Sequence, residues 1–203
     1  MTTADKIATI LREIAPGKRL ATEDVPLINA LAANWDRRNV VPVGAPPWTV
    51  AARKLIGLKE VPGPQHNPII LGFWQKLGAT WLKSDEDPWC GGFMAWSMKE
   101  AGISYPKLYP RAAEWATWGV PCKPQLGAVG VKARKGGNHV FQIVGITADG
   151  LRFKALGGNQ SNGVNIIDVF VRDVTAIRWP KEVPQRNIAL PVMPAGVIGA
   201  SEA

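Results

Sequence analysis

The periodicity of the sequence changes from helical to strand-like near Pro124, and this change limits the possible folds more than any other feature. Before Pro124, apolar residues recur at spacings of three and four, as on one face of an amphipathic helix. After it, short runs rich in β-branched residues are separated by turns that contain Gly, Asn and Asp. Helices followed by a block of strands predict an α+β fold in which helices pack on an antiparallel sheet.

The same patterns divide the chain into a small N-terminal part, a larger body and a tail. Residues 1–40 are expected to form a helical hairpin, which either docks or binds a cell wall or simply packs on the body. Residues 41–48 are rich in Pro and Gly and are expected to form a linker. The body spans residues 49–182, and residues 183–203 are expected to be a flexible tail. Helices are expected over residues 3–14, 22–38, 49–57, 67–77, 88–102 and 111–118. Strands are expected over residues 128–131, 140–146, 151–155, 164–170 and 176–179.

The net charge of +8 points to an anionic partner, either a nucleic acid or a negatively charged cell wall. The basic residues are scattered, and residues 132–135 form the only dense cluster. Because there is no recognition helix and no zinc-finger spacing, we do not expect a nucleic-acid partner. The longest apolar stretch, residues 188–200, is short and broken by prolines, so we expect no stable insertion into a membrane.

A cysteine occurs at the expected start of a helix. Asp87 is a suitable N-cap and Pro88 suits the first helical position, which would place Cys90 in the first turn. The unpaired N–H groups and the positive end of the helix dipole favour the thiolate, which is the nucleophilic form. Gly91 and Gly92 are expected to leave the sulfur accessible. The alternative is a buried cysteine with a purely structural role.

A thiolate nucleophile needs a base, and the base needs an orienting group. His139 opens a predicted strand and, by alternation, shares a face with the core residues, whereas His66 lies in a turn and suits a surface or the rim of a substrate site. If the strands over 140–146 and 151–155 are antiparallel neighbours, the second ends beside His139. Asn159 is then expected to orient the imidazole, with Gln160 as the alternative. Both residues also fit an ordinary polar turn.

We expect no metal and no other cofactor, because the two histidines and two cysteines show no ligand spacing. Cys90 and Cys122 occur in different contexts, one at a helix start and the other in a loop. We therefore expect free thiols rather than a disulfide.

The order of Cys, His and Asn, together with several motifs, resembles the NlpC-type and CHAP-type peptidoglycan hydrolases, and especially a phage-associated, endolysin-like subgroup. The resemblance covers roughly residues 48–180 and implies a papain-like fold that hydrolyses an amide bond in bacterial cell-wall peptide. The motifs are Asp85-x-x-Pro88-Trp89-Cys90, Gly137-Asn138-His139-Val140, Gly157-Gly158-Asn159-Gln160-Ser161-Asn162, Ile56-Gly57-Leu58-Lys59-Glu60 and Asn67-Pro68-Ile69-Ile70.

The resemblance also implies a role for each residue of the site. Cys90 would be the nucleophile, His139 the general base and then the acid, and Asn159 the orienting residue. The backbone N–H of Cys90 is the expected oxyanion donor. Four further residues are expected to bind substrate or to support the site: Trp89, Glu60, Asp85 and Gln160. Glu60 and Asp85 are expected to hold either the nucleophile loop or an amino group of the stem peptide.

Two rival functions remain open at this point. An acyltransferase on the same fold would use an amine in place of water at the second step. A non-catalytic wall-binding protein would use its tryptophans, nine in the chain, to stack on glycan. We expect a monomer that is made in the host cytoplasm without a signal peptide. It would act on the wall, in the periplasm or from outside, as a lysis enzyme or as part of a virion.

Overall fold

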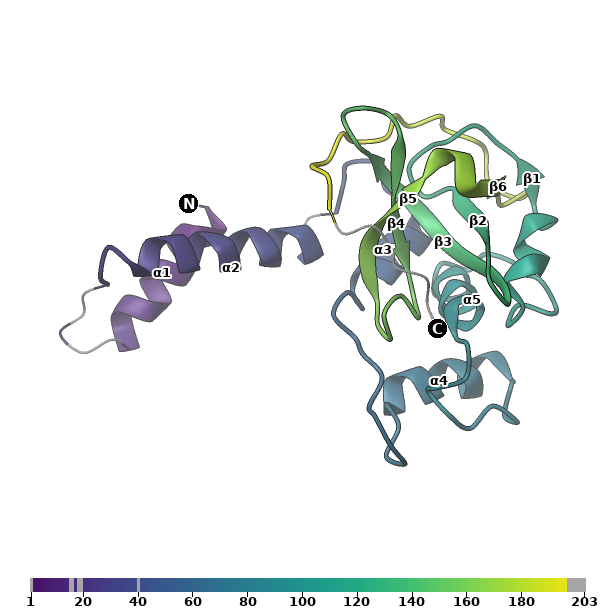
Figure 1. Ribbon diagram of the computed structural model, residues 1–203, viewed down its shortest axis with the longest axis horizontal. Coiled ribbons are helices and arrows are strands. Elements are labelled where there is room, and N and C mark those ends of the chain that lie inside the picture. Colours follow the sequence, from purple (N-terminus) through teal and green to yellow (C-terminus); the bar gives the residue numbers. More distant parts are fainter. Residues whose placement is uncertain (1, 15–16, 18–19, 40, 197–203) are drawn as a thin grey trace. The chain divides into compact units, whose positions relative to one another are not determined.

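The computed structural model describes residues 2–14, 17, 20–39 and 41–196 (Figure 1). The chain divides into two compact units, residues 1–41 and 42–203. No helix in these ranges is both long enough and apolar enough to cross a membrane.

The first unit is a pair of helices, α1 (Thr3–Ile14) and α2 (Asp24–Asn39). A reciprocal cap starts α1: the N–H of Asp5 donates to Oγ1 of Thr2 at 3.1 Å, and the N–H of Thr2 donates to the Asp5 carboxylate at 2.7 Å. Both helices occur where the sequence predicts them. The hairpin buries little, because α1 contains no buried residue.

The second unit contains three helices, α3 (Pro47–Arg53), α4 (Pro68–Leu77) and α5 (Cys90–Glu100), and the short 3₁₀ segments η2 (Ala112–Ala116) and η3 (Val171–Asp173). Helix α4 starts where its sequence predicts: Oδ1 of Asn67 accepts the N–H of Ile69 at 2.9 Å, and Gly78 ends the helix at a φ of 80°. Helix α3 begins two residues before its expected start, because Pro47 takes its first turn.

The strands form one six-stranded antiparallel sheet in the order β1-β6-β2-β3-β4-β5, so the second unit is α+β as predicted. Five of the strands lie within a few residues of their expected positions. The sixth, β1, has only two residues, one of them proline, and its sequence gives no strand signal. The strands are β1 (Val120–Pro121), β2 (Val129–Arg134), β3 (Gly137–Ile146), β4 (Arg152–Gly157), β5 (Asn165–Phe170) and β6 (Val174–Trp179).

Helix α5 packs against β3 and β4, and an aromatic cluster joins it to α4. The ring centroid of Phe73 lies 6.3 Å from the centroids of Trp89 and Phe93 and 5.3 Å from that of Trp96. Trp89 and Phe93 are fully buried, whereas Trp96 is only partly buried. This cluster holds the start of α5 in the core.

Residues after Pro184 were expected to form a flexible tail, but hydrogen bonds hold them to the body as far as Gly196. The N–H of Ile146 donates to the carbonyl of Pro191 at 3.0 Å, and the N–H of Met193 donates back to Ile146 at 2.9 Å. The N–H of Gly196 reaches the carboxylate of Asp168 at 2.9 Å. The many prolines of this segment hide its pairing from a pattern search. Residues 197–203 of the expected tail lie outside the described residues.

Candidate functional site

Helix α5 begins at Cys90 itself, one residue after Trp89, which acts as the N-cap without a side-chain hydrogen bond. Asp87 and Pro88 therefore lie before the helix, and the predicted cap is wrong. The carbonyl of Trp89 accepts the first helical hydrogen bond, from the N–H of Phe93 at 2.8 Å, while its indole is held in the core. Cys90 still occupies the first turn, as expected.

The sulfur-bearing residue is buried, with 2% of its surface exposed, although an accessible position was expected. The two following glycines admit neighbours rather than solvent. A Cβ on Gly91 would lie 2.1 Å from the carbonyl oxygen of Tyr109 and 2.7 Å from that of Pro110. A Cβ on Gly92 would lie 2.4 Å from the indole ring of Trp74. Both glycines are thus required for close packing around the start of α5.

The packing predicts that Gly91→Ala is strongly destabilising. The added methyl group meets backbone carbonyls, which cannot rotate away, so we expect a loss of about 3 kcal/mol in the free energy of unfolding, measured by urea denaturation. Gly72→Ala in α4 is the matched control, because its Cβ meets nothing within 4 Å. Alanine there should stabilise the helix by up to about 1 kcal/mol. Equal effects of the two changes would show that the Tyr109–Pro110 segment is not closely packed on Gly91.

His139 lies on β3 and is fully buried, as is every residue of that strand from His139 to Gly145. Its ring stacks on Phe141, with centroids 6.0 Å apart and an interplanar angle of 20°. Across the ladder, β3 pairs with β2, which places His139 opposite Lys132. Burial and stacking therefore hold the imidazole in the core.

The orienting partner of the imidazole is Gln160: Nε2 of His139 lies 3.0 Å from Oε1 of Gln160. The amide of Gln160 is fixed in direction, because its Nε2 donates to the carbonyl of Asn165 at 2.8 Å, to its Oδ1 at 2.9 Å and to the carbonyl of Ala155 at 3.3 Å. Its oxygen can therefore only accept at the imidazole. It follows that the neutral ring carries its hydrogen on Nε2, and Nδ1 is the basic nitrogen.

The sequence favours Asn159 as the orienting residue, but it is the neighbouring residue, Gln160, that bonds to the imidazole. The β3–β4 ladder pairs Gln142 with Leu156, and straight continuation of this register would bring Asn159 opposite His139. Instead the chain turns, with Asn159 in the left-handed region at a φ of 56° and backbone hydrogen bonds joining Gln160 and Gly163 in both directions. The turn directs Gln160 inward, so the alternative raised from the sequence is the one that contacts the imidazole.

Gly157, the last residue of β4, and Gly158 after it are closely packed. A Cβ on Gly157 would lie 3.2 Å from Nε2 of His139, and a Cβ on Gly158 would lie 2.5 Å from the indole of Trp89 and 2.6 Å from Cβ of Phe93. One segment thus lies close to the imidazole and to residues at the start of α5. The helix that begins at Cys90 also packs on β3, the strand that carries His139.

Glu60 and Trp89 brace this arrangement from a third segment. Nε1 of Trp89 donates to Oε1 of Glu60 at 2.7 Å, and the N–H of Glu60 donates to the carbonyl of Asn162 at 2.9 Å. Burial raises the pKa of Glu60, and the bond from Trp89 offsets part of this effect. Glu60 thus connects Trp89, the residue before Cys90, to the turn that carries Gln160. Of the two roles expected for Glu60, this contact corresponds to holding the nucleophile loop.

Asp85 is fully buried and organises the segment that precedes α4. It accepts hydrogen bonds from the N–H groups of Val61 at 2.8 Å and Asn67 at 2.7 Å, and it pairs with Nδ1 of His66 at 2.9 Å. Burial alone would raise the pKa of Asp85, but these donors outweigh it and the net pKa is lowered. His66 was expected at a surface or substrate rim, and its bond to Asp85 is a contact that the sequence did not reveal.

Burial lowers the pKa of His139 from 6.5 to about 4; the hydrogen bond that His139 donates to Gln160 opposes this shift, and Lys132 and Arg134 add to it. The imidazole is therefore neutral at pH 7. In the unfolded chain it takes up a proton below about pH 6.5, but in the folded chain only near pH 4. Stability is thus fully present above pH 6.5 and falls as the pH falls toward 4.

We expect the free energy of unfolding to drop by about 2–3 kcal/mol between pH 7 and pH 4.5 on this account. Urea denaturation of the wild type and of His139→Gln at both pH values measures the effect. The difference between the two proteins in how their free energy of unfolding changes with pH isolates His139. Asp85, with its lowered pKa, titrates below this pH range. The same pH dependence of the free energy of unfolding in both proteins would show that His139 is not buried as a neutral ring.

Neither Cys90 nor Cys122 forms a disulfide bond. Within the described residues, no group of three or more His, Cys, Asp or Glu side chains is arranged to hold a metal ion.

Comparison of the chain with protein-family models, with curated proteins and with solved structures finds no match.

Proposed function

We propose that this protein is a cysteine-dependent peptidoglycan hydrolase of papain-like fold, similar in role to a phage endolysin, that cleaves an amide bond of the cell-wall peptide. The observation that supports this most strongly is the buried hydrogen bond between His139 and Gln160, next to a helix whose first residue is Cys90. A histidine whose tautomer is fixed by a neutral amide is suited to act as base for a thiol.

The proposed reaction proceeds in two steps. Nδ1 of His139 takes the proton of the Cys90 thiol as the sulfur attacks the amide carbonyl, and the backbone N–H of Cys90 stabilises the oxyanion. His139 then gives its proton to the leaving amine, which leaves a thioester on Cys90. In the second step, water loses a proton to His139 and attacks the thioester, which releases the carboxylic acid and restores the thiol. Gln160 keeps Nε2 protonated throughout.

The proposal requires a movement that admits the substrate, because Cys90 is 2% exposed and His139 is fully buried. The backbone of Tyr109 and Pro110 lies directly against Gly91, the residue after the nucleophile, and is the segment that we propose to move. Displacement of such a segment on substrate binding is a common feature of enzymes that exclude water from the reaction.

The distribution of charge also supports a wall substrate. The second unit holds 18 of the 24 Lys and Arg residues but only 11 of the 16 Asp and Glu residues, and so carries most of the net positive charge. A basic hydrolase is attracted to an anionic cell wall by long-range electrostatics. The near-neutral helical hairpin contributes little to this attraction.

Mass analysis of purified peptidoglycan digested by the protein tests the proposal. We expect soluble fragments that carry one new amine and one new carboxyl group at a single type of amide bond. Addition of a small amine during digestion separates hydrolysis from acyl transfer, because a transferase would attach that amine to the new carbonyl. A preparation that binds peptidoglycan but releases no fragments would contradict both reactions.

A further inference from the structure

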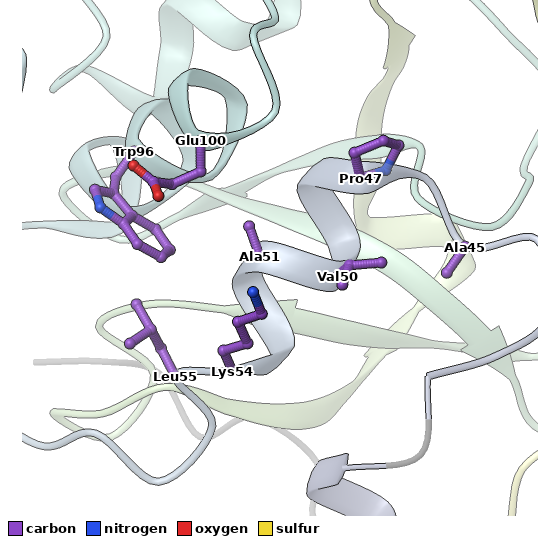
Figure 2. Close-up of a pocket in the computed structure, with 8 residues that line it drawn as sticks. All are labelled: Ala45, Pro47, Val50, Ala51, Lys54, Leu55, Trp96 and Glu100. Carbon is purple, nitrogen blue, oxygen red and sulfur yellow. The ribbon is translucent and has the colours of Figure 1, made fainter.

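A groove lies on the second unit between α3 and the C-terminal end of α5 (Figure 2). It reaches Glu100, ten residues after Cys90 on the same helix, and so lies about 15 Å from the nucleophile along the helix axis. Its volume of about 490 Å³ is in the range of small-ligand sites. None of its lining residues takes part in the site around His139.

The groove combines an aromatic surface with apolar walls and two opposite charges. The half-buried indole of Trp96 is fixed by packing on Phe73, at a centroid distance of 5.3 Å. Figure 2 shows the carboxylate of Glu100 beside this indole, and Glu100 is itself held by an ion pair with Lys76. From α3 and the turn after it come Val50, Leu55 and Lys54.

This chemistry suits a neutral sugar. The apolar face of a sugar ring packs on an indole, and its hydroxyl groups can donate to a carboxylate and accept from an ammonium group. The lining carries one basic and one acidic side chain, Lys54 and Glu100, and lacks the cluster of cations that a phosphate-rich polymer would need. A peptide fits less well, because the walls are helices whose backbone groups bond within the helix, leaving no strand edge to pair with.

We propose that this groove binds the glycan strand of peptidoglycan through an N-acetylated amino sugar, whose ring would pack on Trp96 and whose methyl group would contact Leu55, which lies near that indole in Figure 2. Binding there would hold the polymer near Cys90 while its peptide enters the site. The inference rests on the proposed function, which supplies the polymer.

Calorimetric titration of the full chain with chitotriose, a trimer of N-acetylglucosamine that carries no stem peptide, tests the inference. We expect Trp96→Ala to raise the Kd at least tenfold. Trp81→Ala is the matched control, because Trp81 is 71% exposed and lies outside the groove, and its Kd should equal that of the wild type. Because Trp96 also packs on Phe73, Val50→Arg provides a second test, which fills the groove from a partly exposed position on α3 and should weaken binding equally.

Unchanged affinity in both groove variants, or no saturable binding of chitotriose by the wild type at millimolar concentration, would overturn the inference. Binding of a stem peptide in place of chitotriose, lost in the same variants, would reassign the groove to peptide and also overturn it. These outcomes are distinct from failure of the proposed function. Cleavage of a soluble stem-peptide fragment needs Cys90 and should be unchanged by Val50→Arg.

Discussion

Cys90→Ala is expected to abolish the release of peptidoglycan fragments, with a fall in kcat of at least about 10³-fold, because it removes the thiol on which the proposed thioester forms. The first turn of α5 should remain intact, since alanine occupies less space than cysteine and favours helix. Turbidity loss of purified walls and mass analysis of the products measure the activity. Circular dichroism and co-sedimentation with walls check that the fold and the binding persist.

Cys122→Ala is the matched control for this change. Cys122 also forms no disulfide bond, but burial raises its pKa, which bonding to Gln125 and the charge of Arg178 only partly offset. A thiol of raised pKa is a poor nucleophile, so this variant should keep its activity within about twofold of the wild type. Retained lysis by Cys90→Ala, or loss of lysis in Cys122→Ala alone, would eliminate Cys90 as the nucleophile.

Gln160→Ala is expected to lower kcat by about 10²- to 10⁴-fold, whereas Asn159→Ala should change it by less than about threefold. Loss of the amide oxygen removes the acceptor that keeps the hydrogen of His139 on Nε2, so the ring can present the wrong nitrogen to the thiol. The two variants differ by one position in one turn and form a matched pair. Initial rates on a soluble wall peptide, at a temperature where both remain folded, compare them.

A purely structural role for Gln160 would also reduce activity, so a second readout is needed. The pH dependence of Cys90 alkylation in a Cys122→Ala background serves this purpose. We expect Gln160→Ala to shift this profile and Asn159→Ala to leave it unchanged, because Gln160 is the one of the two that bonds to Nε2 of His139. A larger effect of Asn159→Ala on either measurement would return the orienting role to Asn159.

The α+β class and most of the elements of the second unit follow from patterns in the sequence. Helix α4 shows why: an Asn-Pro start, regularly spaced apolar residues and a terminal glycine all indicate the same element. Helix α5 was predicted with the wrong cap. The capping tendency of Asp87 was overridden by the burial of Trp89, whose indole bonds to Glu60, a residue 29 positions away. Local propensity cannot reveal such a contact.

The surroundings of His139 could be predicted in part. Antiparallel pairing of β3 with β4 brings the end of β4 close to His139, as expected. Burial does not test the alternation along β3, because every residue from His139 to Gly145 is buried. The choice between Asn159 and Gln160 depended on a left-handed turn, whose φ values are not encoded by any spacing rule. The partners of Asp85 and the groove at Trp96 were missed as well, because both are formed by segments distant in sequence.

The most direct measurement is the detection of a thioester on Cys90 during digestion of peptidoglycan. The reaction is stopped with acid, which preserves thioesters, and the protease-generated peptides are examined by mass spectrometry. We expect the peptide that contains Cys90 to carry the mass of a stem-peptide acyl group, which hydroxylamine removes, and the Cys90→Ala sample to carry none. Fragment release by the wild type with an unmodified Cys90 at every time point, and equal release by Cys90→Ala, would contradict the proposed mechanism.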